Sequence, residues 1–72
     1  MSVFNLKRGE SGKIKSVGVF GAAGERLRSL GVEAGARVTV LSFSLFNGSV
    51  LIAVGYNRIA VRRSVAERIE VE

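Results

Sequence analysis

The stretch from Val38 to Asn57 carries no charged side chain, and it constrains the fold more than any other feature of this chain. A helix that crosses a membrane needs ~20 such residues in a row. Polar residues interrupt the stretch, however, and Asn47-Gly48 lies at its centre. Asn-Gly between two β-rich runs is typical of a type I′ hairpin turn, because both residues tolerate the positive φ that this turn needs. The sequence therefore predicts a β-hairpin with a two-residue tip and no membrane-spanning segment.

The rest of the chain also has mostly the pattern of strands. Alternating or β-branched apolar residues predict five strands, at residues 13–19, 36–45, 49–54, 58–62 and 68–72. In the first strand the alternation slips between Ile14 and Val17, which indicates a bulge or a strong bend. Barrel closure requires such bends and protects the edges of a short sheet. The predicted fold class is mostly β: a small five-stranded barrel that occupies residues 1–72 as a single domain.

Two short helical segments interrupt the strands. Apolar residues at helical spacing predict a helix from Gly21 to Leu30, directly after the first strand. Gly31 follows it and can adopt the left-handed conformation that ends many helices. Ser64 is expected to cap a single helical turn that ends at Glu67.

The composition excludes most kinds of chemistry. The chain has no Cys, His or Asp, so the usual zinc, copper and haem sites and the Ser-His and Cys-His nucleophiles are absent. We therefore expect no enzyme, no cofactor and no metal site. The lack of Cys also favours the cytoplasm, and the N-terminus lacks the pattern of a signal peptide.

The charge calls for an acidic partner. Eleven basic residues against six acidic ones give a net charge of +5, which suits nucleic acid, an anionic membrane surface or an acidic protein face. A generally basic soluble surface is the simpler explanation. Gly18, Gly21 and Gly24 resemble a glycine-rich phosphate loop, but no Lys-Ser or Lys-Thr pair follows them, so we expect them to serve backbone geometry.

Three residues are candidates for partner binding. Leu45 and Phe46 lie at the tip of the predicted hairpin, where exposed apolar groups mark a partner site. The alternative is that Phe46 folds back over the sheet as part of the core. Arg62 and Arg63 are adjacent on a strand and so point to opposite faces, which leaves Arg62 facing solvent, where it could bind a carboxylate or a phosphate.

Three blocks of sequence carry a resemblance to a known family. They are Leu6–Gly12, Arg26–Gly35 and Ile59–Val71, and together they resemble the FeoA family, the small cytosolic partner of the bacterial ferrous iron transporter FeoB. The middle block is the most specific, because the family shows Arg-Leu-x-x-Leu-Gly-(aliphatic)-x-Pro-Gly there. In this chain Ala34 stands where the proline is usual, and Phe46–Ser49 stands where the family often has a Gly-x-Pro segment.

This resemblance implies a fold and a role. The fold is an SH3-like barrel with a short helix after the first strand. The role is that of a non-catalytic accessory protein in ferrous iron uptake, which binds the cytoplasmic, nucleotide-binding region of FeoB. A similar domain ends some iron- and manganese-dependent repressors, but only five residues precede Leu6, so we expect the free-standing form. A small basic barrel that binds nucleic acid and a stand-alone relative of the repressor domain stay open as alternatives, as does self-association; direct membrane insertion is not expected.

Overall fold

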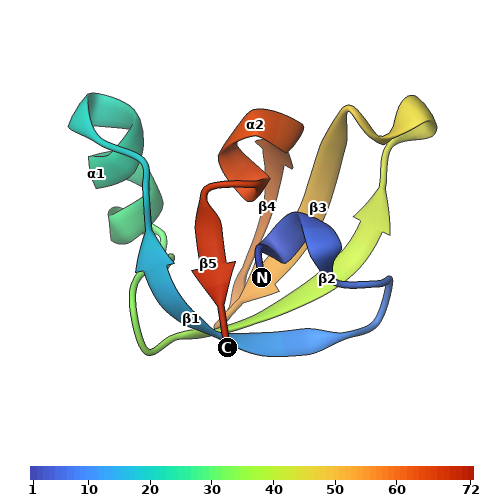
Figure 1. The fold of residues 1–72 in the computed structure, drawn as a ribbon. Helices are drawn as coiled ribbons and strands as arrows, with labels where there is room; N and C mark the ends of the chain where they lie inside the picture. The colour runs from blue at the N-terminus through green and yellow to red at the C-terminus, as the bar shows by residue number, and fades with distance from the viewer.

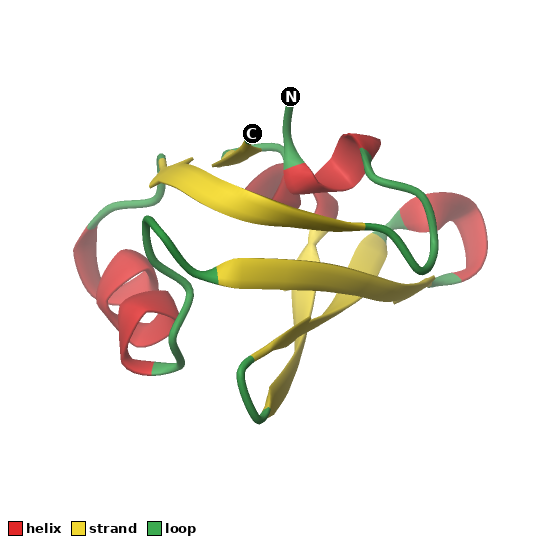
Figure 2. Ribbon diagram, turned by 90° about the horizontal axis from the view of Figure 1, so that it is seen from below, coloured by secondary structure: helices red, strands yellow, loops and turns green.

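Five antiparallel strands, in the order β4-β3-β2-β1-β5, form the framework of the computed structural model, which describes residues 1–72 (Figure 1). The elements in chain order are η1 (Val3–Asn5), β1 (Ser11–Val17), α1 (Gly21–Ser29), β2 (Arg37–Phe43), η2 (Leu45–Asn47), β3 (Ser49–Val54), β4 (Asn57–Arg62), α2 (Arg63–Ala66) and β5 (Ile69–Val71). The sheet bends so strongly that β3 and β4 lie at a steep angle to β1, while β1 and β2 run side by side (Figure 2). The predicted mostly-β architecture, with one helix after the first strand, is confirmed.

The predicted slip in the first strand is confirmed as a bulge. The pairing of β1 with β5 shifts register between Ile14 and Ser16. A second shift lies in β2, between Val40 and Ser42, and the sequence did not point to it. The extra residue at each bulge bends its strand, and both bulged strands lie within the sheet, each with a neighbour on either side. These bends let a sheet of short strands wrap around its own core.

The interior is a single apolar cluster. Because side chains alternate across a strand, β3 buries every second residue, at Val50, Ile52 and Val54. Fourteen buried apolar residues form the cluster: Val3, Leu6, Ile14, Leu27, Val32, Val38, Val40, Val50, Ile52, Val54, Val61, Ala66, Ile69 and Val71. Neither helix has the length and apolar character that a membrane crossing requires.

Helix α1 ends where the sequence predicts. Leu30 is its C-cap, and Gly31 follows with a φ of 93°. The Gly31 N–H donates to the Arg28 carbonyl at 3.0 Å, and the Val32 N–H donates to the Leu27 carbonyl at 2.9 Å. These two bonds are the Schellman motif, which satisfies the last carbonyls of the helix.

The turn of the β2–β3 hairpin differs from the prediction. The hairpin forms, but a type I′ turn at Asn47-Gly48 is wrong, because φ is positive at Phe46 (65°) and Asn47 (56°) while Gly48 is right-handed. The loop has five residues, 44–48, instead of a two-residue tip. Ser44 closes it: its N–H donates to the Ser49 carbonyl at 3.0 Å, and its Oγ accepts from the Ser49 N–H at 2.9 Å.

Several other boundaries move. Helix α2 begins at Arg63 with Arg62 as its N-cap residue, so the prediction of Ser64 as the cap is wrong; Ser64 lies inside the turn. Strand β1 begins and ends two residues earlier than predicted, and β2 is shorter at both ends. The third strand has the predicted bounds, Ser49–Val54.

Candidate partner-binding site

The β2–β3 loop carries the two apolar side chains that the sequence singled out. Leu45 is 82% exposed and Phe46 is 90% exposed. Phe46 therefore does not fold back over the sheet, and the core alternative for this residue is wrong. Its positive φ is a conformation that bulky residues seldom adopt, so the backbone here departs from the local preference of the sequence.

The structure places Arg62 beside this loop. Arg62 pairs with Ser49, the first residue of β3, and is exposed as predicted. The next residue confirms the proximity, because the Arg63 N–H donates to the carbonyl of Gly48, the last residue of the loop, at 3.0 Å. The three candidate residues thus lie at the same end of β3.

Beneath the loop lies a cluster that sequence reasoning missed. The guanidinium carbon of Arg63 lies 4.5 Å from the centre of the Phe4 ring. That ring meets Phe43 edge to face, with centroids 5.8 Å apart. Arg63 also donates from Nε to Glu67 at 3.3 Å. Phe43 ends β2 just before the loop, so this cluster joins η1, α2 and the base of the loop.

The other large exposed apolar side chains lie elsewhere. Phe20, 83% exposed, precedes α1, and Tyr56 lies fully exposed in the turn between β3 and β4. Tyr56 and Phe46 occupy opposite ends of β3, while α1 and the β2–β3 loop lie on opposite sides of the molecule (Figure 1). The exposed aromatic rings therefore do not form one surface.

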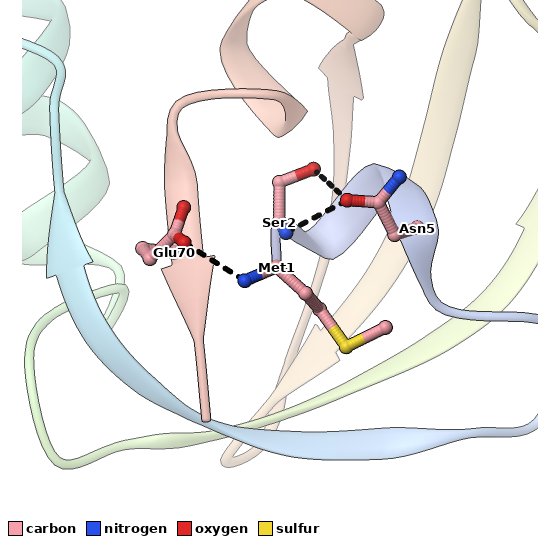
Figure 3. A network of polar contacts seen from close by, with 4 residues as sticks. All are labelled: Met1, Ser2, Asn5 and Glu70. Carbon is pink, nitrogen blue, oxygen red and sulfur yellow. Dashed lines mark hydrogen bonds and ion pairs between the residues drawn. The ribbon is translucent and has the colours of Figure 1, made fainter.

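The chain start is tied to the last strand (Figure 3). The Met1 ammonium donates to Glu70 Oε1 at 2.8 Å, and Asn5 Oδ1 accepts from both the N–H and the hydroxyl of Ser2. The hydrogen bond from the ammonium, and then its charge, lower the pKa of the Glu70 carboxyl. This contact holds the N-terminal arm against β5 and involves no residue of the β2–β3 loop.

No three residues of the types His, Cys, Asp and Glu gather in a way that could hold a metal ion. Three of the glutamates have partners within the chain: Glu67 accepts from Arg63, Glu70 from the N-terminal ammonium, and Glu10 from the Lys7 N–H. The groups exposed around the β2–β3 loop are the apolar side chains of Leu45 and Phe46 and the guanidinium of Arg62.

The chain is similar throughout its length to one known protein family. A family model for the FeoA domain matches residues 1–72. The solution structure of the FeoA protein from Chlorobium tepidum is 31% identical with a TM-score of 0.93, over 99% of this chain and 68% of that chain. The crystal structure of Stenotrophomonas maltophilia FeoA complexed with zinc is 32% identical with a TM-score of 0.85, over 100% of this chain and 89% of that one.

The Stenotrophomonas protein is described as a prokaryotic SH3 domain protein and a candidate activating factor of ferrous iron transport. A manganese-dependent transcriptional repressor has a TM-score of 0.85 over 99% of this chain and 40% of its own, but at 18% identity this is a likeness of fold alone. None of the curated proteins matches the chain. The SH3-like fold expected from the sequence is confirmed.

Proposed function

Because this chain belongs to the FeoA family, which is associated with ferrous iron transport, we propose that it is a non-catalytic accessory protein that binds the cytoplasmic region of the transporter FeoB. The contact is made by the β2–β3 loop through Leu45 and Phe46, with Arg62 beside it. The protein performs no reaction and acts in the cytoplasm by association alone.

The exposure of Phe46 is the observation that carries this proposal. A phenyl ring that is 90% exposed leaves nearly all of its surface in water, at about 25 cal/mol per Å² of apolar area. Its neighbour Leu45 adds a second exposed apolar group. Burial of both in a groove of a larger protein removes this cost and provides two anchors of the type that dominate protein interfaces.

The charge of the chain supports an acidic partner. Residues 37–63 contain four arginines and no acidic residue, and Arg62 lies next to the loop. Such charges speed the encounter with an acidic surface, whereas the apolar anchors set the lifetime of the complex. The two parts of the site therefore have separable effects on binding.

Nucleic acid is a weaker candidate for the partner. Proteins that bind single strands combine a basic groove with aromatic side chains on which successive bases stack. Here the exposed rings of Phe20, Phe46 and Tyr56 belong to three separate connections of the chain, and Phe46 and Tyr56 lie at opposite ends of β3. No continuous stacking surface is present.

The test is a binding titration with the purified cytoplasmic region of FeoB. We expect Phe46→Ser and Leu45→Ser to keep the fold and to weaken binding by about tenfold or more, as the loss of an anchor does. Tyr56→Ser is the matched control, because it removes an equally exposed ring from the other end of β3 and should leave the affinity unchanged.

Circular dichroism of each variant separates folding from binding. If Phe46→Ser unfolds the protein, the exposed ring is needed for folding and not for binding, and if the folded variant binds as tightly as the original, the loop is not the site. A parallel titration with a single-stranded oligonucleotide tests the alternative partner: tighter binding there than to the FeoB region contradicts the proposal.

A further inference from the structure

A groove of about 450 Å³ lies between α1 and β4 and is lined by no residue of the β2–β3 loop. Leu27 and Leu30 of α1 line one side, and the consecutive residues Ile59 to Arg62 of β4 line the other. Successive residues of a strand point to opposite faces, so four in a row can line one groove only if the groove runs along the edge of the strand. The groove thus follows the free edge of β4, which has β3 on its other side only.

The backbone of that edge is unpaired. The two-residue turn between β3 and β4 is flanked by the pair Val54 and Asn57, which is hydrogen-bonded in such hairpins. The bond from Arg63 N–H to the Gly48 carbonyl continues the same alternation at the far end of the ladder. Arg58 and Ala60 therefore direct their N–H and C=O groups away from β3, and no hydrogen bond outside the β3–β4 ladder involves their backbone.

The charges along this edge select its occupant. If a second copy added its own β4 antiparallel around Ala60, Arg58 of one copy would face Arg62 of the other, and like charges directly opposite each other are destabilising. Arg26 of α1 adds a further cation to the groove. The edge thus disfavours self-pairing and favours a strand that carries carboxylates.

We propose that the free edge of β4 binds an extended acidic segment of a partner protein as an added strand. The segment places acidic side chains opposite Arg58 and Arg62, a small residue opposite Ala60, and apolar side chains between them on the face of Ile59 and Val61. Its pattern is acidic-apolar-small-apolar-acidic, and its backbone supplies the missing hydrogen bonds. This surface is distinct from the β2–β3 loop and shares only Arg62 with it.

The first experiment measures charge recognition by fluorescence anisotropy. The probe is a fluorescein-labelled peptide with the core Glu-Val-Ser-Val-Glu, and the control is the same peptide with Lys in place of both Glu. We expect the acidic peptide to bind about tenfold or more tightly than the basic one. In the double variant R58E/R62E this preference should reverse, and equal binding of both peptides to either protein contradicts the proposal.

The second experiment tests the added strand itself. When the peptide adds antiparallel to β4, N-methylation of its Ser removes an N–H that faces β4, whereas N-methylation of a Val removes one that faces away. We expect only the first to abolish binding. In the protein, Ala60→Pro removes an outward N–H that the β3–β4 ladder does not use. Edge strands tolerate a proline at such a position. This variant should keep the fold and lose the peptide, with Ala60→Ser as the control that retains it.

Binding of the peptide should not depend on the β2–β3 loop. Phe46→Ser should bind the peptide as the original protein does, and the amide resonances that move on binding should be those of β4 and α1. The proposal is overturned if both N-methylated peptides bind equally, if the shifts map to residues 44–48, or if a single-stranded oligonucleotide displaces the peptide at equal concentration.

Discussion

Among single residues, Gly31 shows how the sequence determines a backbone position. Its φ of 93° is left-handed, and a Cβ there would meet Val54 Cγ1 at an ordinary 3.6 Å. A Cβ at this position would therefore strain the backbone without colliding with a neighbour. We expect Gly31→Val to lower the free energy of unfolding by more than about 1 kcal/mol, measured by chemical denaturation.

The matched control for Gly31 is Gly48, which is right-handed and has room for a Cβ. Gly48→Ala should leave the denaturation midpoint unchanged or raise it slightly. An unchanged midpoint for Gly31→Val would show that the helix ends without this glycine.

Glu70 gives the fold a dependence on pH. The Met1 ammonium lowers the pKa of its carboxyl, first by a hydrogen bond and then by charge, and Lys15 adds to the effect. A lowered pKa in the folded state means that the contact stabilises the fold above the ordinary Glu pKa and is lost as the pH falls through the folded value. Urea midpoints of the original protein and of Glu70→Gln should therefore differ at pH 7 and converge once the pH falls below the lowered pKa of Glu70. A constant difference would contradict this role.

The contacts of some other residues could not have been predicted from the sequence. Gly24 packs so closely on the Val19 carbonyl that a Cβ would overlap it. The sequence predicted that Gly24 serves backbone geometry, but it did not predict this contact. Arg63 stacks on Phe4, a residue at the other end of the chain. Contacts of this kind depend on tertiary arrangement, for which local spacing provides no signal.

Among the elements, the β2–β3 loop is the one that the sequence predicts in kind but not in detail. Asn47-Gly48 correctly indicates a hairpin, and the exposure of Leu45 and Phe46 follows from their place in it. The turn nevertheless differs from the predicted one, because Ser44 forms hydrogen bonds to Ser49 across the strand ends and so closes a five-residue loop. Local propensity favours a type I′ turn at Asn47-Gly48, but the hydrogen bonds between Ser44 and Ser49 stabilise the five-residue loop instead.

The strain at Phe46 leads to a prediction about this loop. A bulky residue with φ of 65° costs about 1 kcal/mol, which glycine does not pay. Phe46→Gly should therefore leave the melting temperature unchanged or raise it, while it weakens binding to the FeoB cytoplasmic region as Phe46→Ser does. The two measurements together show whether the strain is retained for binding. A fall in melting temperature of several degrees would indicate that the ring stabilises the fold.

At the scale of the whole molecule, the composition bears on metal binding. Iron sites generally draw on His, Cys or several converging carboxylates, and this chain has only glutamates for the purpose. Two of the six are engaged in ion pairs within the chain. We expect anaerobic calorimetry with ferrous iron to show no stoichiometric binding below about 1 µM. A tight, stoichiometric site would contradict this.

The net charge of +5 should govern how fast the molecule finds an acidic partner. Arg62 lies beside the loop, so its loss removes a charge that acts during approach while the apolar anchors remain. We expect Arg62→Gln to slow association with the FeoB cytoplasmic region by about twofold to fivefold at low salt and to flatten the dependence of the rate on salt. Arg37→Gln makes the same change in charge at the far end of β2 and should have the smaller effect. If both variants give the same salt dependence in stopped-flow measurements, the charge acts through the whole surface, and Arg62 has no particular place in the encounter.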